Sequence, residues 1–261
     1  MKFRNLCTII FCAVLQFSCD QLNNADSSAA PYPPLPAIDV QWSTQNTLLC
    51  FGTSLTYGYG AGEKKKNFGP IIVPVGGGGT PSNNNVGDSS YPRFLQEKLK
   101  ITVLNKGYVG ARMSYALTIL ADSVISQKPA LVLLEYGAND FLWDIPAHTA
   151  DSLLSLLVTR LQYSGAKVVL LSFIHPDMLQ YTTSGGWSSE DSFLALEYNS
   201  MINTVATKFS VPLIDYPLKG VFGHTDLMSD RFHPNGAGYK KMEENIYYAL
   251  IKTFEKNGML K

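Results

Sequence analysis

Short apolar runs alternate along the chain with stretches in which apolar residues recur every three or four positions. The apolar runs are rich in aliphatic and β-branched residues, which is typical of strands, and the periodic stretches are typical of helices. The strand-like runs cover 46–53, 101–105, 130–135, 167–173 and 211–214. The helix-like stretches cover 91–99, 112–126, 149–163, 190–209 and 236–256. Five such repeats predict an α/β fold of three layers, α/β/α, around a five-stranded parallel sheet.

The strand-like runs show little alternation between apolar and polar residues. Segments such as 131–134 and 168–171 are apolar throughout, as expected for parallel strands that are covered on both faces. In this architecture ligands bind beyond the carboxyl ends of the strands. Ser54 and the segments 107–110, 137–140 and 174–189 each follow a predicted strand. We therefore expect them to meet at one edge of the sheet.

The first residues have the pattern of an export signal. Lys2 and Arg4 precede an apolar segment, 6–17, which is too short for a permanent membrane span, and Ser18 and Cys19 follow it. A small residue before a cysteine resembles the processing site of bacterial lipoproteins. We expect a signal peptide of the lipoprotein type over 1–18, lipidation of Cys19, and an exported protein anchored to a membrane and facing the periplasm or the cell surface. Ordinary secretion and an uncleaved anchor are the alternatives.

The rest of the chain divides into a linker and one domain. Residues 19–39 are polar and then proline-rich, which predicts an extended tether. The domain proper is expected over 40–261, with a long insert at 60–89 that is either a lid or a mobile insertion. Aromatic residues in 141–143 and in the 174–189 loop either line an acyl or sugar pocket or cap the core.

Composition excludes several classes of function. The formal net charge is zero and no basic patch stands out, so we expect no nucleic-acid partner. Histidine, cysteine and acidic residues do not cluster with the spacing of metal ligands, and we expect neither a metal nor another cofactor. Cys50 is the single cysteine beyond residue 19, so an intramolecular disulfide is not expected, and a small buried residue is the simplest interpretation.

The candidate chemistry starts at Ser54, in a tight turn of small residues directly after the first strand. A serine hydroxyl is a weak nucleophile that needs a base, an acid to orient the base, and donors for the developing oxyanion. Asp230 and His233 stand three residues apart on a predicted turn, where a carboxylate can hold one imidazole nitrogen while the other faces Ser54. The N–H groups of Ser54 and Gly110 and the side-chain amide of Asn139 are the candidate oxyanion donors.

These blocks resemble the signature of the SGNH, or GDSL-type, hydrolases. Around 90–95 and 134–142 the chain resembles the lysophospholipase, thioesterase and arylesterase branch of that family. The family pattern covers 52–55, 105–110, 137–140 and 230–233, in the family's order. The resemblance implies the flavodoxin-like SGNH fold, Ser54 as nucleophile, Asp230 and His233 as the rest of the triad, and Gly110 and Asn139 as oxyanion donors. Thr53 departs from the pattern, because the family has an aspartate there that supports the turn.

We therefore expect a serine esterase that hydrolyses acyl esters or lysophospholipid-type substrates through an acyl-enzyme on Ser54. A polysaccharide O-acetylesterase of the same fold is the alternative, because neither fold nor triad selects the substrate. A hypothesis of another class is a non-catalytic surface lipoprotein that uses the fold as a binding module. The expected partners are a small ester, a lipid or an acylated glycan as substrate, and a membrane through the anchor at Cys19.

Overall fold

The computed structural model describes residues 47–62, 89–173 and 189–256. The predicted signal segment 1–18, the tether 19–39 with Cys19, nearly all of the insert 60–89 and most of the loop 174–189 lie outside these residues. The predictions for them stay predictions.

The centre of the described part is a five-stranded sheet in which every paired strand is parallel. The spatial order of the strands is β2-β1-β3-β4-β5, and this confirms the predicted α/β fold with a five-stranded parallel sheet. The strands are β1 (Thr47–Gly52), β2 (Thr102–Gly107), β3 (Leu131–Glu135), β4 (Lys167–Ser172) and β5 (Leu213–Asp215).

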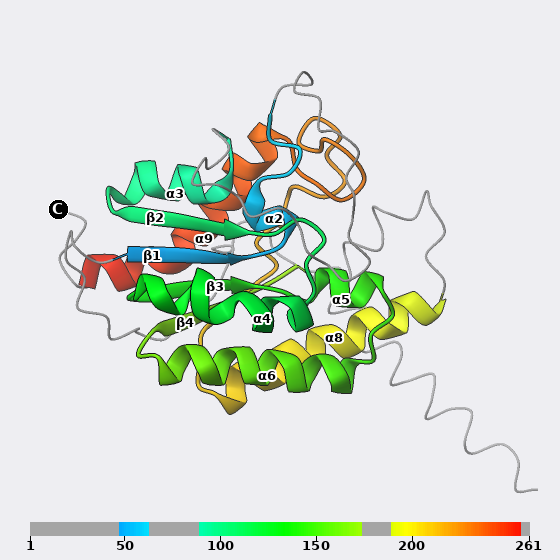
Figure 1. Cartoon of the computed structure of the whole chain (residues 1–261). Coiled ribbons are helices and arrows are strands. Elements are labelled where there is room, and N and C mark those ends of the chain that lie inside the picture. Colours follow the sequence, from blue (N-terminus) through cyan, green and yellow to red (C-terminus); the bar gives the residue numbers. More distant parts are fainter. Residues whose placement is uncertain (1–46, 63–88, 174–188, 257–261) are drawn as a thin grey trace, which may run out of the picture. The chain divides into compact units, whose positions relative to one another are not determined.

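Helices cover both faces of this sheet (Figure 1). On one face α3 (Tyr91–Leu99) packs against β2 and against α9 (Gly236–Lys256). On the other face α6 (Ala147–Tyr163) packs between α4 (Met113–Ser123) and α8 (Ser189–Lys208). Because the chain moves from β1 to β2 and then returns past β1 to β3, the helices change face at that point. The carboxyl end of β1 therefore lies at the topological switch point, where such folds bind their ligands.

The element boundaries agree closely with the predicted ranges, and the differences are local. The predicted helix 112–126 stops at Ser123, where the fully buried Val124 leaves the helical conformation, and the 3₁₀ helix η1 (Ile125–Gln127) follows. β2 runs two residues further than predicted because it stays paired with β1 as far as Gly107. Two one-turn helices were not predicted: α2 (Ser54–Tyr57) directly after β1, and α5 (Ala138–Leu142) after β3.

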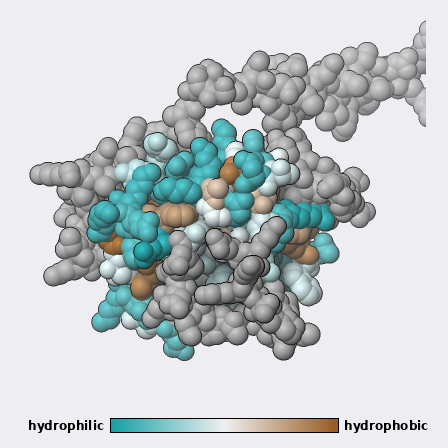
Figure 2. Space-filling model, turned by 90° about the horizontal axis from the view of Figure 1, so that it is seen from above, coloured by the Kyte–Doolittle hydropathy of each residue, from teal (hydrophilic) through white to brown (hydrophobic). Residues whose placement is uncertain are grey.

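The central strands β1, β3 and β4 are buried along almost their whole length, whereas β2 at the edge of the sheet alternates between buried and more exposed residues. All five residues of β3 are buried, as are the last five of β1 and of β4. Burial on both faces explains why these runs lack alternation of apolar and polar residues. Among the coloured residues of the face in Figure 2, hydrophilic ones predominate and the hydrophobic ones form small separate groups. Among the described helices, none combines the length and the apolar character needed to cross a membrane.

The register of the central strands brings three loops to the same level. Gly52, the last residue of β1, pairs with Gly107 of β2 on one side and with Glu135 of β3 on the other. Gly107 has no side chain, and a Cβ there would overlap the backbone nitrogen of Tyr57. This glycine thus lets the helical turn α2 lie directly against the end of β2.

Candidate active site

Ser54 is the first residue of α2 and follows the buried end of β1. The residue is 8% exposed, so it is screened from most of the solvent but not closed off. The helical turn ends at Gly58, whose φ of 90° lies in the left-handed region, and the N–H groups of Gly58 and Tyr59 both donate to the carbonyl of Ser54. The turn that sequence reasoning expected at Ser54 is thus one complete turn of α-helix.

Asp230 and His233 lie on a closed loop between β5 and α9. Asp230 Oδ1 accepts the backbone N–H groups of Phe232 and His233, each at 2.8 Å, and the N–H of Ser229 donates to the carbonyl of His233 at 2.8 Å. At the far side, Asn235 Oδ1 accepts the N–H groups of two residues in the first turn of α9. These bonds fix the turn 229–233 and its junction with α9.

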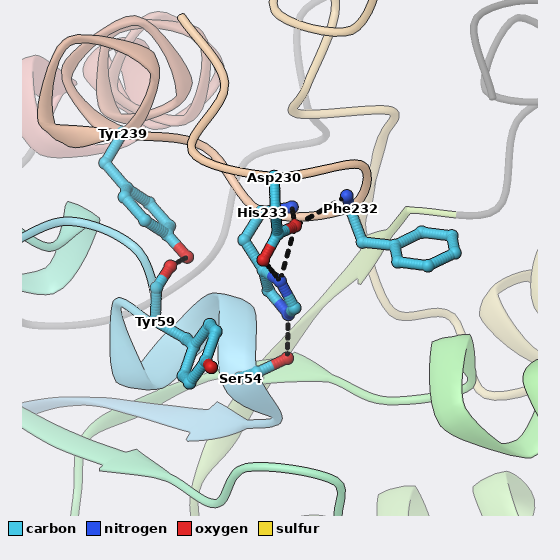
Figure 3. A network of polar contacts seen from close by, with 6 residues as sticks. All are labelled: Ser54, Tyr59, Asp230, Phe232, His233 and Tyr239. Atoms are coloured by element: carbon cyan, nitrogen blue, oxygen red, sulfur yellow. Dashed lines mark hydrogen bonds and ion pairs between the residues drawn. The ribbon is translucent and has the colours of Figure 1, made fainter. Parts of the chain in front are cut away.

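The structure brings this loop to Ser54 (Figure 3). Both carboxylate oxygens of Asp230 lie 2.9 Å from Nδ1 of His233, and Nε2 of His233 lies 3.0 Å from Oγ of Ser54. An ionised carboxylate only accepts hydrogen bonds, so Nδ1 carries the imidazole proton. Nε2 of the neutral ring is then an acceptor, and the hydroxyl of Ser54 donates to it.

The carboxylate of Asp230 stays ionised over the whole working range of pH. Partial burial opposes its ionisation, but the hydrogen bond with His233 and the backbone N–H of Phe232 outweigh this effect and lower the pKa of Asp230 to about 2. Asp230 therefore keeps a negative charge beside the imidazole of His233. This charge stabilises the imidazolium that forms when the imidazole acts as a base and takes up a proton.

An aromatic ring packs against the imidazole. The ring of Tyr59 lies 4.7 Å from that of His233, measured between centroids, at an angle of 57°. The carbonyl of Tyr59 accepts a hydrogen bond of 2.8 Å from the buried hydroxyl of Tyr239 on α9 (Figure 3). Sequence reasoning did not single out Tyr59, because a tyrosine four residues past a turn carries no motif.

The candidate oxyanion donors Gly110 and Asn139 lie in the turns after β2 and β3. Gly110 has a φ of 72°, which glycine adopts without strain, and its neighbour Ala111 accepts a hydrogen bond of 2.8 Å from Nδ2 of Asn139. The buried carboxylate of Asp140 accepts the N–H of Met113 at 3.1 and 3.2 Å. Burial raises the pKa of Asp140 to about 6, although the Met113 N–H opposes this effect. Two adjacent residues of α5 thus hold the glycine turn in place.

An open pocket of about 580 Å³, including solvent at its mouth, lies over Ser54. Its polar lining residues are Thr53, Ser54, Asn139 and His233, and the rest of its wall is apolar. Gly110 does not line it. The apolar lining residues are Leu55, Ala138, Phe141, Leu142, Phe173, Phe222 and Phe232.

The sequence leaves two interpretations open for the aromatic residues of 141–143, a pocket lining and a cap on the core, and the first holds for part of the segment. Phe141 and Leu142 line the pocket, but Trp143 is 60% exposed and does not, and its ring lies 5.4 Å from the guanidinium carbon of Arg112. The phenylalanines at 173, 222 and 232 were not predicted as pocket residues, because they come from three separate segments of the chain. Within the described residues, no group of three histidine, cysteine or acidic side chains could hold a metal ion.

Sequence reasoning also missed Glu135, the last residue of β3. It is completely buried, and its carboxylate accepts hydrogen bonds from the residues that flank Ser54. A signal was present, since an acidic residue ends an otherwise apolar strand.

Comparison with known proteins agrees with this architecture. Residues 50–241 match the model of the GDSL-like Lipase/Acylhydrolase family. Esterase TesA of Pseudomonas aeruginosa is 26% identical over 159 residues, which cover 60% of this chain and 74% of that protein. The arylesterase of Vibrio mimicus is 26% identical over 171 residues, covering 63% of this chain and 80% of that protein. The crystal structure of the psychrotrophic esterase EstA from Pseudoalteromonas sp. has a TM-score of 0.62 at 22% identity, covering 80% of this chain and 99% of that one.

Together, the parallel α/β fold, the family match and these relatives identify the class of protein as the esterases, which hydrolyse carboxylic esters. The chain belongs to the GDSL-like lipase/acylhydrolase family.

The lowered pKa of Asp230 generates a prediction about stability in acid. A carboxylate whose pKa is about 2 in the folded state and near the ordinary aspartate value of 3.8 in the unfolded chain stabilises the folded state above pH 4, and this contribution disappears as the pH falls towards 2. Because 45% of the side chain is exposed, we expect this pH-dependent part to stay below about 1 kcal/mol. The difference in free energy of unfolding between wild type and Asp230→Asn should therefore shrink between pH 5 and pH 2.

Urea unfolding at several pH values measures this difference. Asp122→Asn, which removes an exposed carboxylate from α4, is the matched control for the loss of one negative charge. A difference for Asp230→Asn that stayed constant or grew towards pH 2 would show that the carboxylate is not held ionised by its partners.

Proposed function

We propose that this chain is a serine esterase in which Ser54 is the nucleophile, His233 the general base and Asp230 the residue that orients the base. One observation carries the proposal: Oγ of Ser54 lies 3.0 Å from Nε2 of His233, whose other nitrogen is held by Asp230. A hydrogen bond of this length lets the imidazole take the hydroxyl proton during attack without prior rearrangement.

The reaction proceeds in two steps. Oγ of Ser54 attacks the ester carbonyl carbon while its proton moves to Nε2 of His233, and the tetrahedral intermediate then expels the alcohol, which leaves with that proton. Water next attacks the acyl-enzyme, and the same nitrogen takes its proton. The acid is released as Ser54 regains its hydrogen. The protonated imidazole of each step lies beside the ionised carboxylate of Asp230.

Three N–H groups are assigned to the oxyanion. Ser54 is the first residue of a helix, and the first N–H groups of a helix have no acceptor within it. Nδ2 of Asn139 uses one hydrogen for the carbonyl of Ala111, which orients the amide and leaves its second hydrogen for a ligand in the pocket that Asn139 lines. The third donor is the N–H of Gly110, in the turn that is held by the hydrogen bond from Asn139 to the carbonyl of Ala111. Removal of one oxyanion donor typically lowers turnover by about 10²–10³-fold.

The pocket supports an apolar acyl group as the part of the substrate that it binds. Seven of its eleven lining residues are apolar, and the four polar ones are the nucleophile, the base, Asn139 and Thr53. Within the described lining, few polar groups are then left to bond the hydroxyls of a sugar, whereas a hydrocarbon chain fits such a wall. We propose acyl esters, including those of lysophospholipids, as substrates in preference to acetylated polysaccharide.

The first prediction concerns the nucleophile. A fluorophosphonate probe should form one covalent adduct with the wild-type protein, because the activated hydroxyl attacks phosphorus as it would attack an ester carbonyl. The adduct should be absent from Ser54→Ala, as measured by intact-protein mass spectrometry. Ser114→Ala, an exposed serine on α4, is the control and should label like wild type. Folded wild-type protein without an adduct would support the binding-module hypothesis instead.

The second prediction concerns the acyl group. For p-nitrophenyl esters, kcat/KM should rise from acetate to octanoate, because each buried methylene contributes up to about 0.8 kcal/mol. Leu142→Ser, at a partly exposed position of the pocket wall, should flatten this rise, whereas Leu156→Ser, equally exposed on α6, should preserve it. Acetate release from acetylated xylan without activity on octanoate would establish the polysaccharide esterase.

We also propose that the exported protein is anchored to a membrane by lipid at Cys19. The proposal is supported by the apolar segment 6–17 and the small residue Ser18 before the cysteine. After expression of the full chain in a bacterium, an alkyne-palmitate label should appear on the wild type and be lost in Cys19→Ser. Cys50→Ser is the control, since Cys50 is buried in β1. A label that survived Cys19→Ser, or a protein found only in the soluble fraction, would contradict the anchor.

A further inference from the structure

A buried carboxylate lies beneath the turn that carries Ser54. Glu135 is 0% exposed, and its Oε2 accepts the backbone N–H of Thr53 at 2.7 Å and the hydroxyl of Thr56 at 3.0 Å. The hydroxyl of Thr53 lies 2.9 Å from both oxygens of the same carboxylate. One side chain from β3 thus bonds residues on both sides of Ser54.

The neighbouring strand leaves room for this contact. Gly52 of β1 pairs with Glu135, and a Cβ at that position would lie 2.5 Å from Oε2 of Glu135 and would overlap Oγ1 of Thr56. A side chain at position 52 would therefore push the carboxylate away from the turn.

No cation compensates this charge among the described residues, because none of their ion pairs includes Glu135. Burial raises the pKa of Glu135 to about 7, although the hydrogen bonds from Thr53 and Thr56 oppose this effect. The titratable groups that face it are Tyr91 of α3, Tyr239 of α9 and its neighbour Tyr136, and burial raises the pKa of each well above its usual value. These tyrosines are neutral near pH 7, so hydrogen bonds alone stabilise the carboxylate.

We propose that Glu135 is a positioning residue for ester hydrolysis, whose carboxylate holds the turn 53–56 so that Ser54 meets both His233 and the substrate. This inference rests on the proposed function. A buried carboxylate without a cation costs stability, and an apolar residue there would continue the core of β3. Above about pH 7, where it is ionised, the carboxylate accepts three donors at once, which an amide or an apolar side chain cannot do. The donors are the N–H of Thr53 and the hydroxyls of Thr53 and Thr56.

Glu135→Gln tests the inference with almost no change in volume. The amide replaces one acceptor oxygen by a donor that faces the donors of Thr53 or Thr56, so the turn should shift. We expect kcat for a p-nitrophenyl ester to fall about 10–100-fold with KM within about twofold, because small displacements of a catalytic group cost rate more than binding. The rate constant of fluorophosphonate labelling should fall in parallel.

Glu243→Gln is the matched control, since Glu243 is also 0% exposed but lies on α9, paired with Lys240. It should lower the free energy of unfolding and leave kcat per labelled site unchanged. If Glu135→Gln behaved in the same way, Glu135 would be merely structural. Should Glu135→Gln not fold, Thr56→Val removes one donor and should lower kcat roughly threefold to tenfold. Unchanged turnover in that variant would overturn the inference.

The pH dependence of unfolding gives a readout that is independent of activity. Because the folded state holds the proton of Glu135 up to about pH 7 and the unfolded chain releases it near the ordinary glutamate pKa of 4.5, this group makes stability fall as the pH rises between these values. That component should be missing from Glu135→Gln and present in Glu243→Gln. Its presence in both would show that this component comes from another group and that Glu135 is ionised below pH 7 as well, which would extend the range in which its carboxylate can hold the turn.

The two proposals fail separately. Wild type without Ser54-dependent hydrolysis refutes the proposed function. If the wild type hydrolyses esters through Ser54 and the Glu135→Gln variant has the same kcat, only the role of Glu135 is refuted.

Discussion

The hydrogen bond between Ser54 and His233 joins residues that stand 179 positions apart, and it depends on the register of the parallel sheet. Gly52 is level with Gly107 and Glu135, so the turns that follow β1, β2 and β3 leave the sheet at one edge and at one height. The loop between β5 and α9 then only has to reach that edge. A shift of one residue between β1 and β3 would point the side chain of position 135 to the other face and separate the turns.

Much of this arrangement could be predicted because it is local in the sequence. A run such as 131–134 is apolar at every position, and this is possible only where both faces of a strand are covered. Parallel strands then imply that their carboxyl ends share an edge, and this is why Ser54, Asn139 and the turn at Gly110 could be expected near one another. Asp230 and His233 could be paired because three residues of a turn bring a carboxylate to an imidazole, as the distance of 2.9 Å shows.

Other parts of the site have no local signature. Phe173, Phe222 and Phe232 line one pocket but come from three separate segments, and each is an ordinary apolar residue in its own surroundings. Tyr59 gains its place beside His233 through a bond of its backbone carbonyl to Tyr239 of α9, a partner 180 residues away. The one-turn helices α2 and α5 are too short to show a helical period. Their geometry follows from tertiary packing, such as the close approach of Tyr57 to Gly107.

Thr53 shows how a departure from a family pattern can be understood from its surroundings. Its hydroxyl is a donor and lies 2.9 Å from each oxygen of Glu135, whereas the aspartate of the GDSL-type pattern would present a second acceptor to the same carboxylate. The threonine therefore does not leave the turn unsupported, because it draws support from β3 through the hydroxyl and the backbone N–H together. The buried acid and the hydroxyl residues around Ser54 form one unit, in which the change of any member leaves a donor or an acceptor in the core without its partner.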